Sequence, residues 1–254
     1  MISKTILRLA LFIIYTPVIL SAQPKVIVAA AADLKPALDS IVAVYKARNG
    51  VTDIEIIYGA SGNLFEQIST DAPFDIFLSA DMDYPNKLKE ENFTISGVYR
   101  YATGQLALWS IKNDPSVEQM NTLLKPDMVK IAIANPSTAP YGSRAVESMK
   151  YYKVYDKVVN KLVYGENIAQ TGQFVSSGAA DIGIIALSMA RSPAMKKAGG
   201  SYWVIPETSH DPLVQGCVLL KHAAGSGEAK NLFDFFASEK AKAIFGFFGY
   251  IQKG

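Results

Sequence analysis

Small and polar residues follow several apolar segments of this chain and come just before predicted helices. These junctions are Ala30-Ala31-Ala32-Asp33, Gly59-Ala60-Ser61-Gly62-Asn63, residues 135–143 and Gly165-Glu166-Asn167-Ile168. The first turn of a helix presents backbone N–H groups that have no partner within the helix, and the helix dipole adds positive potential there. Several helix N-termini directed at one point could therefore bind a small anion without a lysine or arginine.

Each junction offers a candidate binding residue that also has a simpler structural role. Ser61 could donate its hydroxyl and its N–H to an anion, or it could cap its helix. Tyr141 could donate its backbone N–H, or it could simply belong to a turn. Ile168 offers only a backbone N–H and is otherwise a core residue, and Asp33 is typical of a helix cap. At this level both roles stay open at every position.

The chain lacks the sequence patterns of common catalytic and metal sites. It contains no GxxxxGK[ST] loop, no HExxH and no CxxC. The segment Gly59–Asn63 is close to a nucleophile elbow but lacks its second glycine. A hydrolase triad that uses His210 and Asp211, or a metal site made of Asp81 and Asp83, is a minor alternative. We predict a binding protein that is not an enzyme and that uses no cofactor and no protein-bound metal.

Residues 1–22 are typical of an export signal. Lys4 and Arg8 precede an apolar segment from Leu9 to Leu20, and two small residues follow it. The apolar segment has about 12 residues, fewer than the ~20 that cross a bilayer. We predict cleavage near Ala22 and export to the periplasm, with a membrane anchor as the alternative.

The charge and cysteine content exclude other classes of protein. The chain has 25 basic and 23 acidic residues, and Lys4 and Arg8 belong to the predicted signal, so the mature protein is expected to be nearly neutral. A neutral chain is not expected to bind nucleic acid or an acidic membrane surface. The single cysteine, Cys217, lies in an apolar segment and is predicted to be a core residue.

Predicted strands and helices alternate along the mature chain. The predicted strands are Lys25–Ala31, Asp53–Tyr58, Phe74–Ser79, Tyr101–Ser110, Lys130–Ala134, Asp181–Ala186 and Val214–Lys221. The predicted helices are a segment from Leu34 that ends at Gly50, then Gly62–Thr70, Pro85–Glu91, Ser143–Tyr151, Tyr155–Leu162, Ala169–Ser177, Glu228–Ala237 and Glu239–Phe248. This alternation predicts an α/β fold with parallel strands covered by helices.

Two segments are predicted to connect two α/β lobes. The long run Tyr101–Ser110, with Gly104 in its middle, is typical of a strand that passes from one lobe to the other, although a bulge is the alternative. Tyr202–Pro206 is predicted to return. We therefore expect residues 23–102 and 208–254 to form lobe I and residues 103–207 to form lobe II. The ligand cleft is expected to lie between them.

Short segments spread over the mature chain match one protein family. They are VAAAADLKPAL at 28–38, GASGNLFEQI at 59–68, APFDIFLSAD at 72–81, AIANPSTAPYG at 132–142, GENI at 165–168, GAADIGIIAL at 178–187 and FGY at 248–250. With these segments in this order, the chain resembles the periplasmic molybdate-binding proteins of ABC transporters. The resemblance implies the type II periplasmic binding-protein fold over essentially the whole mature chain.

The resemblance also implies a ligand, a partner and a set of binding residues. The expected ligand is a tetrahedral oxyanion, molybdate or tungstate, which a monomeric receptor delivers to the permease of an ABC importer. Ser61 is implied to donate its hydroxyl and N–H, Tyr141 and Ile168 their backbone N–H groups, while Ala32 and Asp33 form the first-turn site. Sulfate or phosphate is the alternative ligand, and a periplasmic enzyme on the same fold is a more remote alternative.

Asp33 departs from the pattern of this family, in which a neutral donor is usual. An ionised carboxylate would repel molybdate, which carries no proton at neutral pH. Three arrangements avoid the repulsion: the side chain turns back to cap its helix, the carboxyl group is protonated, or the ligand brings a proton. We expect the first, because aspartate is a good helix cap.

Overall fold

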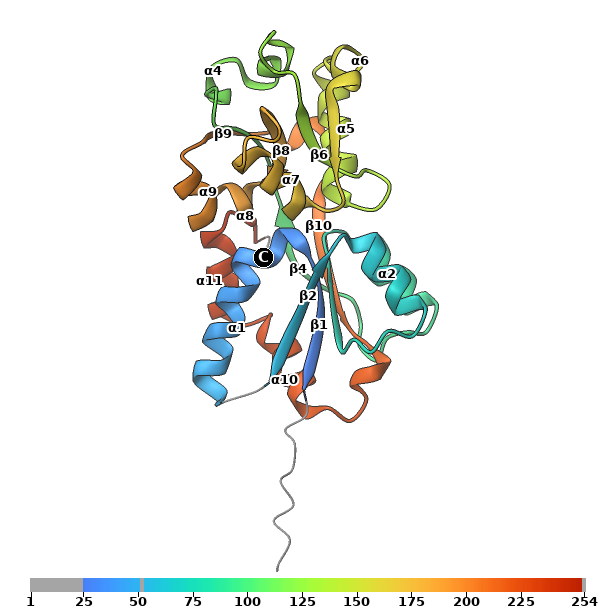
Figure 1. Cartoon of the computed structure of the whole chain (residues 1–254). Helices are drawn as coiled ribbons and strands as arrows, with labels where there is room; N and C mark the ends of the chain where they lie inside the picture. Colours follow the sequence, from blue (N-terminus) through green and yellow to red (C-terminus); the bar gives the residue numbers. More distant parts are fainter. Residues whose placement is uncertain (1–24, 51–52, 253–254) are drawn as a thin grey trace, which may run out of the picture.

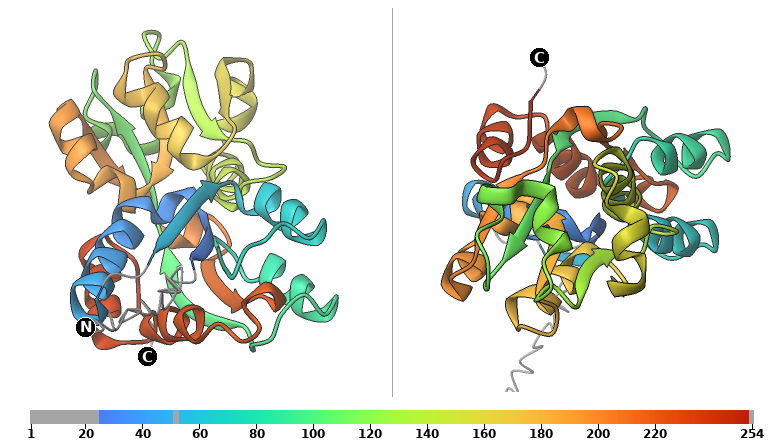
Figure 2. Two further views of the ribbon diagram at one scale, coloured as in Figure 1. Left: turned by 60° about the horizontal axis from the view of Figure 1, so that its bottom comes forward. Right: turned by 90° about the horizontal axis from the view of Figure 1, so that it is seen from above.

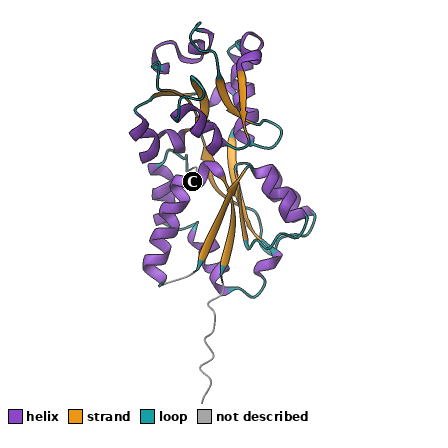
Figure 3. Cartoon of the chain, viewed as in Figure 1, coloured by secondary structure: helices purple, strands orange, loops and turns teal. Residues whose placement is uncertain are grey.

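Residues 25–50 and 53–252 contain two five-stranded sheets, one in each half (Figure 1). The computed structural model describes residues 25–50 and 53–252, and the predicted export signal lies outside this part of the chain. The strand order is β2-β1-β3-β10-β4 in the first sheet and β7-β6-β8-β5-β9 in the second. Helices lie against both sheets, as Figure 3 shows. The predicted α/β class is confirmed.

The first sheet combines strands from the beginning and the end of the chain. Its strands are β1 (Val26–Ala31), β2 (Ile54–Gly59), β3 (Ile76–Ser79), β4 (Tyr99–Gly104) and β10 (Leu213–Leu219). β1 is parallel to β2 and β3, whereas β10 is antiparallel to β3 and β4. Figure 2 shows this arrangement by colour, since the orange segment of β10 returns among the blue and green strands.

Helices cover both faces of the first sheet. They are α1 (Lys35–Asn49), α10 (Gly227–Phe235) and α11 (Glu239–Phe247) on one face, and α2 (Ser61–Ser69) and α3 (Asp83–Glu90) on the other. Successive residues of a strand point to opposite faces, so Val28 packs with α1 whereas Ala29 packs with α2. This explains why β1 is apolar throughout.

The second sheet is built on the same plan. Its strands are β5 (Leu106–Ser110), β6 (Ile131–Ala134), β7 (Leu162–Gly165), β8 (Ile182–Ala186) and β9 (Ser201–Val204). β6 is parallel to β7 and β8, and β5 is antiparallel to β8 and β9. Around it lie α4 (Pro115–Glu118), α5 (Pro140–Tyr151), α6 (Tyr155–Val158), α7 (Ile168–Ser176), α8 (Leu187–Ala190) and α9 (Pro193–Ala198). Short 3₁₀ segments η1 (Ala32–Leu34), η2 (Gln119–Leu124), η3 (Val159–Lys161), η4 (Glu207–Ser209) and η5 (Lys221–Ala223) connect the elements.

The chain passes from one sheet to the other twice. Only Gln105 separates β4 from β5, so the predicted strand Tyr101–Ser110 is two strands, one in each sheet. The return passage follows β9. The prediction that Tyr202–Pro206 forms this passage is therefore corrected, because residues up to Val204 pair with β5 in the second sheet. The division of the chain at 102/103 and 207/208 stays a prediction.

Two further predictions of local structure were wrong. The predicted helix Tyr155–Leu162 ends at Val158, and the strand β7 that follows was missed, because so short an apolar run has no distinctive period. The predicted helix at Ser143 begins earlier, at Pro140, where a proline fits the first turn. Within the described ranges, no helix is long and apolar enough to cross a membrane.

Candidate anion-binding site

The predicted junctions lie at the carboxyl ends of parallel strands, between the two halves of the molecule. The chain leaves β1 for η1, β2 for α2, β6 for α5 and β7 for α7. In open α/β sheets, ligands bind at this edge of the strands. Because the helices follow the strands directly, their N-termini are also located there.

A small cavity lies where these helices begin. Its volume is about 10 Å³, which is close to the space that one water molecule requires. The residues that line it are Ala31, Ala32, Asp33, Gly59, Ala60, Ser61, Ala80, Ala139, Pro140, Tyr141 and Ile168. The structure thus brings all the sequence-predicted site residues together at one point, and no lysine, arginine or histidine is among the lining residues.

Three helices direct their first turns at the cavity. Ser61 is the first residue of α2, Ile168 is the first of α7, and Tyr141 is the second of α5. Their N–H groups belong to the set that has no acceptor inside a helix. At α7 the side chain of Asn167 accepts the next two N–H groups, those of Ala169 and Gln170, and so does not occupy that of Ile168.

Ser61 is buried and does not cap its helix. The N-cap of α2 is Ala60, with no side-chain cap hydrogen bond, so the capping alternative for Ser61 is wrong. Its Oγ instead accepts a hydrogen bond from the N–H of Ala80 at 3.0 Å. Since the oxygen is an acceptor in that bond, the hydroxyl hydrogen is free to be donated to a ligand.

Asp33 is fully buried, and the expected capping role is also wrong. Neither η1 nor α1 has a side-chain cap hydrogen bond, and their N-caps are Ala31 and Leu34. The Oδ2 atom of Asp33 instead accepts hydrogen bonds from Gln215 Nε2 at 2.9 Å and from the Tyr250 hydroxyl at 2.8 Å. The side chain turns away from its own helix because these donors lie on β10 and near the C-terminus.

A neutral network holds the Asp33 carboxyl group. The Tyr101 hydroxyl donates to Gln215 Oε1 at 2.7 Å, and this directs the Gln215 amide nitrogen toward Asp33 and toward the Tyr141 hydroxyl, 3.1 Å away. Burial raises the pKa of Asp33 to about 6, although the hydrogen bonds from Gln215 and Tyr250, the nearby Tyr141 hydroxyl and the backbone N–H of Asp33 itself act in the opposite direction. Its Oδ1 atom has no hydrogen-bond partner within the described residues.

Sequence analysis missed Gln215 and Tyr250 as site residues. The only local signal for Gln215 was a glutamine inside the otherwise apolar strand Leu213–Leu219. Tyr250 belongs to a segment that matched the family, but nothing in its neighbourhood indicated a role at Asp33.

The charge of Asp33 matters for any anion in the cavity. Two unit charges of the same sign about 4 Å apart repel each other by about 4 kcal/mol at an effective dielectric constant of about 20.

Hydrogen bonds join the two halves of the molecule around the cavity. The N–H of Gly62 donates to the carbonyl oxygen of Thr138 at 2.9 Å, and the Ser188 hydroxyl donates to the carbonyl oxygen of Asp33 at 2.8 Å. Gly62 and Asp33 belong to elements of the first half, and Thr138 and Ser188 to the second. The two halves of the molecule are therefore in contact next to the cavity.

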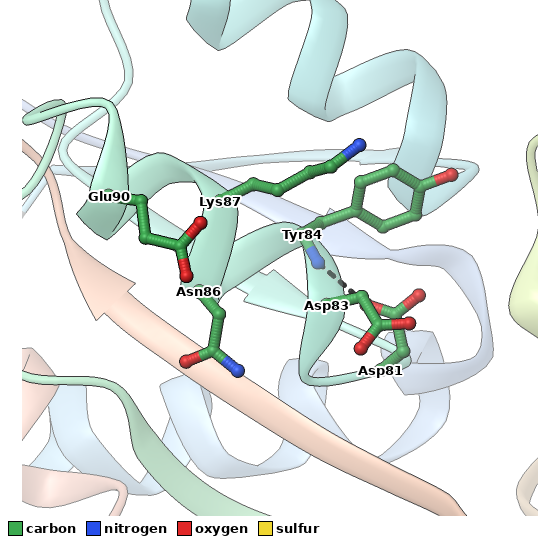
Figure 4. Close-up of a pocket in the computed structure, with 6 residues that line it drawn as sticks. All are labelled: Asp81, Asp83, Tyr84, Asn86, Lys87 and Glu90. Carbon is green, nitrogen blue, oxygen red and sulfur yellow. Dashed lines mark hydrogen bonds between the residues drawn. The ribbon is translucent and has the colours of Figure 1, made fainter.

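A larger hollow lies at α3 and does not suit an anion. Its volume is about 510 Å³, and Figure 4 shows its lining residues Asp81, Asp83, Tyr84, Asn86, Lys87 and Glu90. Three carboxylates against one lysine would repel an oxyanion. Asp81 Oδ1 accepts the N–H of Tyr84 at 3.2 Å, which supports the start of α3. Among the residues that the structure describes, no group of acidic, histidine or cysteine side chains could hold a metal ion.

Two α/β halves around a cavity built from helix N-termini define a solute receptor with the type II periplasmic binding-protein fold. The chain belongs to the family of bacterial extracellular solute-binding proteins, whose sequence model matches residues 26–251. As a solute-binding protein it is not an enzyme, which confirms that prediction.

Individual relatives agree with this assignment. The chain is 37% identical to the molybdate-binding protein ModA of Rhodobacter capsulatus over 235 residues, which are 92% of this chain and 90% of the relative. The structure matches the periplasmic molybdate-binding protein of Azotobacter vinelandii with a TM-score of 0.83 and 29% identity, over 91% of this chain and 100% of that one. The sulfate-binding protein SubI of Mycobacterium tuberculosis shares the fold, with a TM-score of 0.72 at 12% identity over 89% of this chain and 86% of that one.

Proposed function

We propose that this chain is a periplasmic receptor that binds molybdate or tungstate and delivers it to the permease of an ABC importer. One observation carries the proposal: a single small cavity gathers the N-termini of α2, α5 and α7 and has no basic side chain in its lining. Two curated relatives, 37% and 35% identical, are molybdate-binding proteins. The predicted signal at residues 1–22 supports export, and we propose that the receptor acts as a monomer.

The proposed binding mode relies on neutral donors. The hydroxyl and N–H of Ser61 and the N–H groups of Tyr141 and Ile168 would replace water around the oxyanion. Most other lining residues are alanine, glycine or proline, so backbone atoms can approach the ligand closely. A ring of oriented amide dipoles stabilises negative charge without a counter-ion. Selectivity over the smaller sulfate ion would then depend on the size of the cavity.

Closure of the two halves is the proposed response to the ligand. Donors come from both halves, Ser61 from one and Tyr141 and Ile168 from the other. A ligand that contacts both therefore favours the conformation in which the halves touch, and it shifts the population toward that state by its difference in affinity. The bonds Gly62–Thr138 and Ser188–Asp33 belong to this conformation.

Thermal unfolding with a series of oxyanions tests the proposal. Ligand at about 100 times its dissociation constant stabilises the fold by about 2.7 kcal/mol. For a chain of this size that raises the melting temperature by roughly 5–10 °C. We expect this shift with molybdate and tungstate but not with sulfate or phosphate at equal ionic strength. A shift with phosphate alone would identify a receptor for a different oxyanion.

A further inference from the structure

We propose that the receptor takes up one proton when it binds its dianion, and that this proton lies between a ligand oxygen and Oδ1 of Asp33. The inference rests on the proposed function for the identity of the ligand. It assigns Asp33 the role of a hydrogen-bond donor in the bound state. The prediction of a capping role, which the structure contradicts, had assigned it only a backbone contact.

The two oxygens of Asp33 have different surroundings. Oδ2 accepts two hydrogen bonds, from Gln215 at 2.9 Å and from Tyr250 at 2.8 Å. Oδ1 is buried and has no partner within the described residues, although Asp33 lines the cavity. Buried polar atoms are rarely left without a partner unless a ligand or ion supplies one. A protonated carboxyl group has one O–H donor, and Oδ1 is the oxygen that is free to carry it.

Among the described residues, hydrogen bonds but no cation stabilise a negative charge on Asp33. The titratable groups that face it are the neutral phenols of Tyr101 on β4, Tyr141 on α5 and Tyr250 near the C-terminus. The carboxylate of Asp81 also acts on Tyr101, and it has the same sign as the carboxylate of Asp33. An ionised Asp33 beside a dianion would therefore place three negative charges in a cavity without a cation.

Uptake of a proton resolves this conflict. Burial already raises the pKa of Asp33 to about 6, and a bound dianion would raise it further, because like charges disfavour the ionised form. The balance is simple: a carboxylate, a dianion and one proton from solvent give a complex in which the Oδ1–H group donates to a ligand oxygen. No covalent bond of the oxyanion breaks. A hydrogen oxyanion would bring the proton itself and would require no uptake.

Calorimetric titration of the wild type measures the proton directly. Molybdate is titrated at about pH 8 into the protein in two buffers that differ in ionisation enthalpy, and the difference in heat gives the number of protons bound. We expect about one proton per ligand and an affinity that falls about tenfold for each pH unit between about pH 7 and about pH 9. Binding without proton uptake would overturn the inference and leave the proposed function intact. Failure of both molybdate and tungstate to bind would overturn both.

The Asp33→Asn variant assigns the proton to this side chain. The amide oxygen of asparagine can accept from Gln215 and Tyr250, and its NH₂ group can donate to the ligand in place of the Oδ1–H group. We expect this variant to bind molybdate with almost no proton uptake and with little dependence on pH. The matched control Asp156→Asn, which removes an exposed carboxylate in α6, should behave as the wild type. Full proton uptake in Asp33→Asn would overturn the assignment, and if this variant does not fold, the wild-type titration decides.

Discussion

Substitution of Gly62 by alanine tests whether the halves close on the ligand as they are arranged in this structure. Gly62 is the second residue of α2, and its N–H donates to the Thr138 carbonyl oxygen at 2.9 Å. A Cβ at position 62 would lie 3.0 Å from that oxygen, 3.2 Å from the Thr138 Cα and 2.6 Å from the Tyr84 hydroxyl. The hydroxyl is the far end of the Tyr84 side chain, which belongs to the same half as Gly62, whereas the Thr138 backbone belongs to the other half.

The expected effects on stability and on affinity have opposite directions. Alanine stabilises a helix relative to glycine by roughly 0.5–1 kcal/mol, so the ligand-free variant should be as stable as the wild type or slightly more stable. In the closed state the added methyl group is forced against backbone, and such overpacking costs about 1–3 kcal/mol. Affinity for molybdate should therefore fall by a factor of roughly 5 to 150.

Two measurements and one control separate these effects. Thermal unfolding without ligand measures stability, and calorimetric titration measures affinity. The control is Gly246→Ala in α11, where an added Cβ would have no atom of the described residues within 4 Å apart from its chain neighbours and the backbone of its own helix. It should show the same gain in helix stability and no change in affinity. If Gly62→Ala binds molybdate as tightly as the wild type, the halves do not meet at Gly62 and Thr138 in the bound state.

Three further predictions concern the site. Ser61→Ala should weaken molybdate binding by about 1.5–3 kcal/mol, roughly 10- to 150-fold in a calorimetric titration. The control Ser148→Ala, which removes a buried hydroxyl of the second half, should lower stability alone. Equal affinities of Ser61→Ala and the wild type would exclude Ser61 from the site. Gly104→Ala places a Cβ 2.2 Å from the Tyr141 hydroxyl and should weaken binding by displacing the network at Asp33, so an unchanged affinity would contradict that account. Burial raises the pKa of Asp33 to about 6, so the stability that depends on its protonated form is present below the unfolded value of about 3.9 and is lost as the pH rises through about 6. In urea unfolding of the free protein, Asp33→Asn should be less sensitive than the wild type over this range, and equal sensitivity would contradict the assigned pKa.

The sequence alone was sufficient for most of the strands and helices around the site and for the junctions between them. Apolar segments that end in small residues predicted β1, β2 and β6 to within one residue at either end, because local periodicity and turn residues determine where strands and helices start and stop. The same reasoning proposed Ser61, Tyr141 and Ile168 as candidates, since a helix N-terminus can be recognised from its own residues, and all three line the cavity. It failed at β7, which was predicted as part of a helix, and at Gln105, where two strands were predicted as one. A segment of only a few residues has no distinctive period that separates one kind of structure from another.

Only the tertiary structure decided the state of Asp33. Its donors Gln215 and Tyr250 are 182 and 217 residues away along the chain, and no local pattern connects them to position 33. Burial and hydrogen-bond partners are properties of packed neighbours, and they determine whether a carboxyl group caps a helix, stays ionised or holds a proton. Local sequence therefore predicted where an anion could bind, whereas the fold determined which proton and which partners accompany it there.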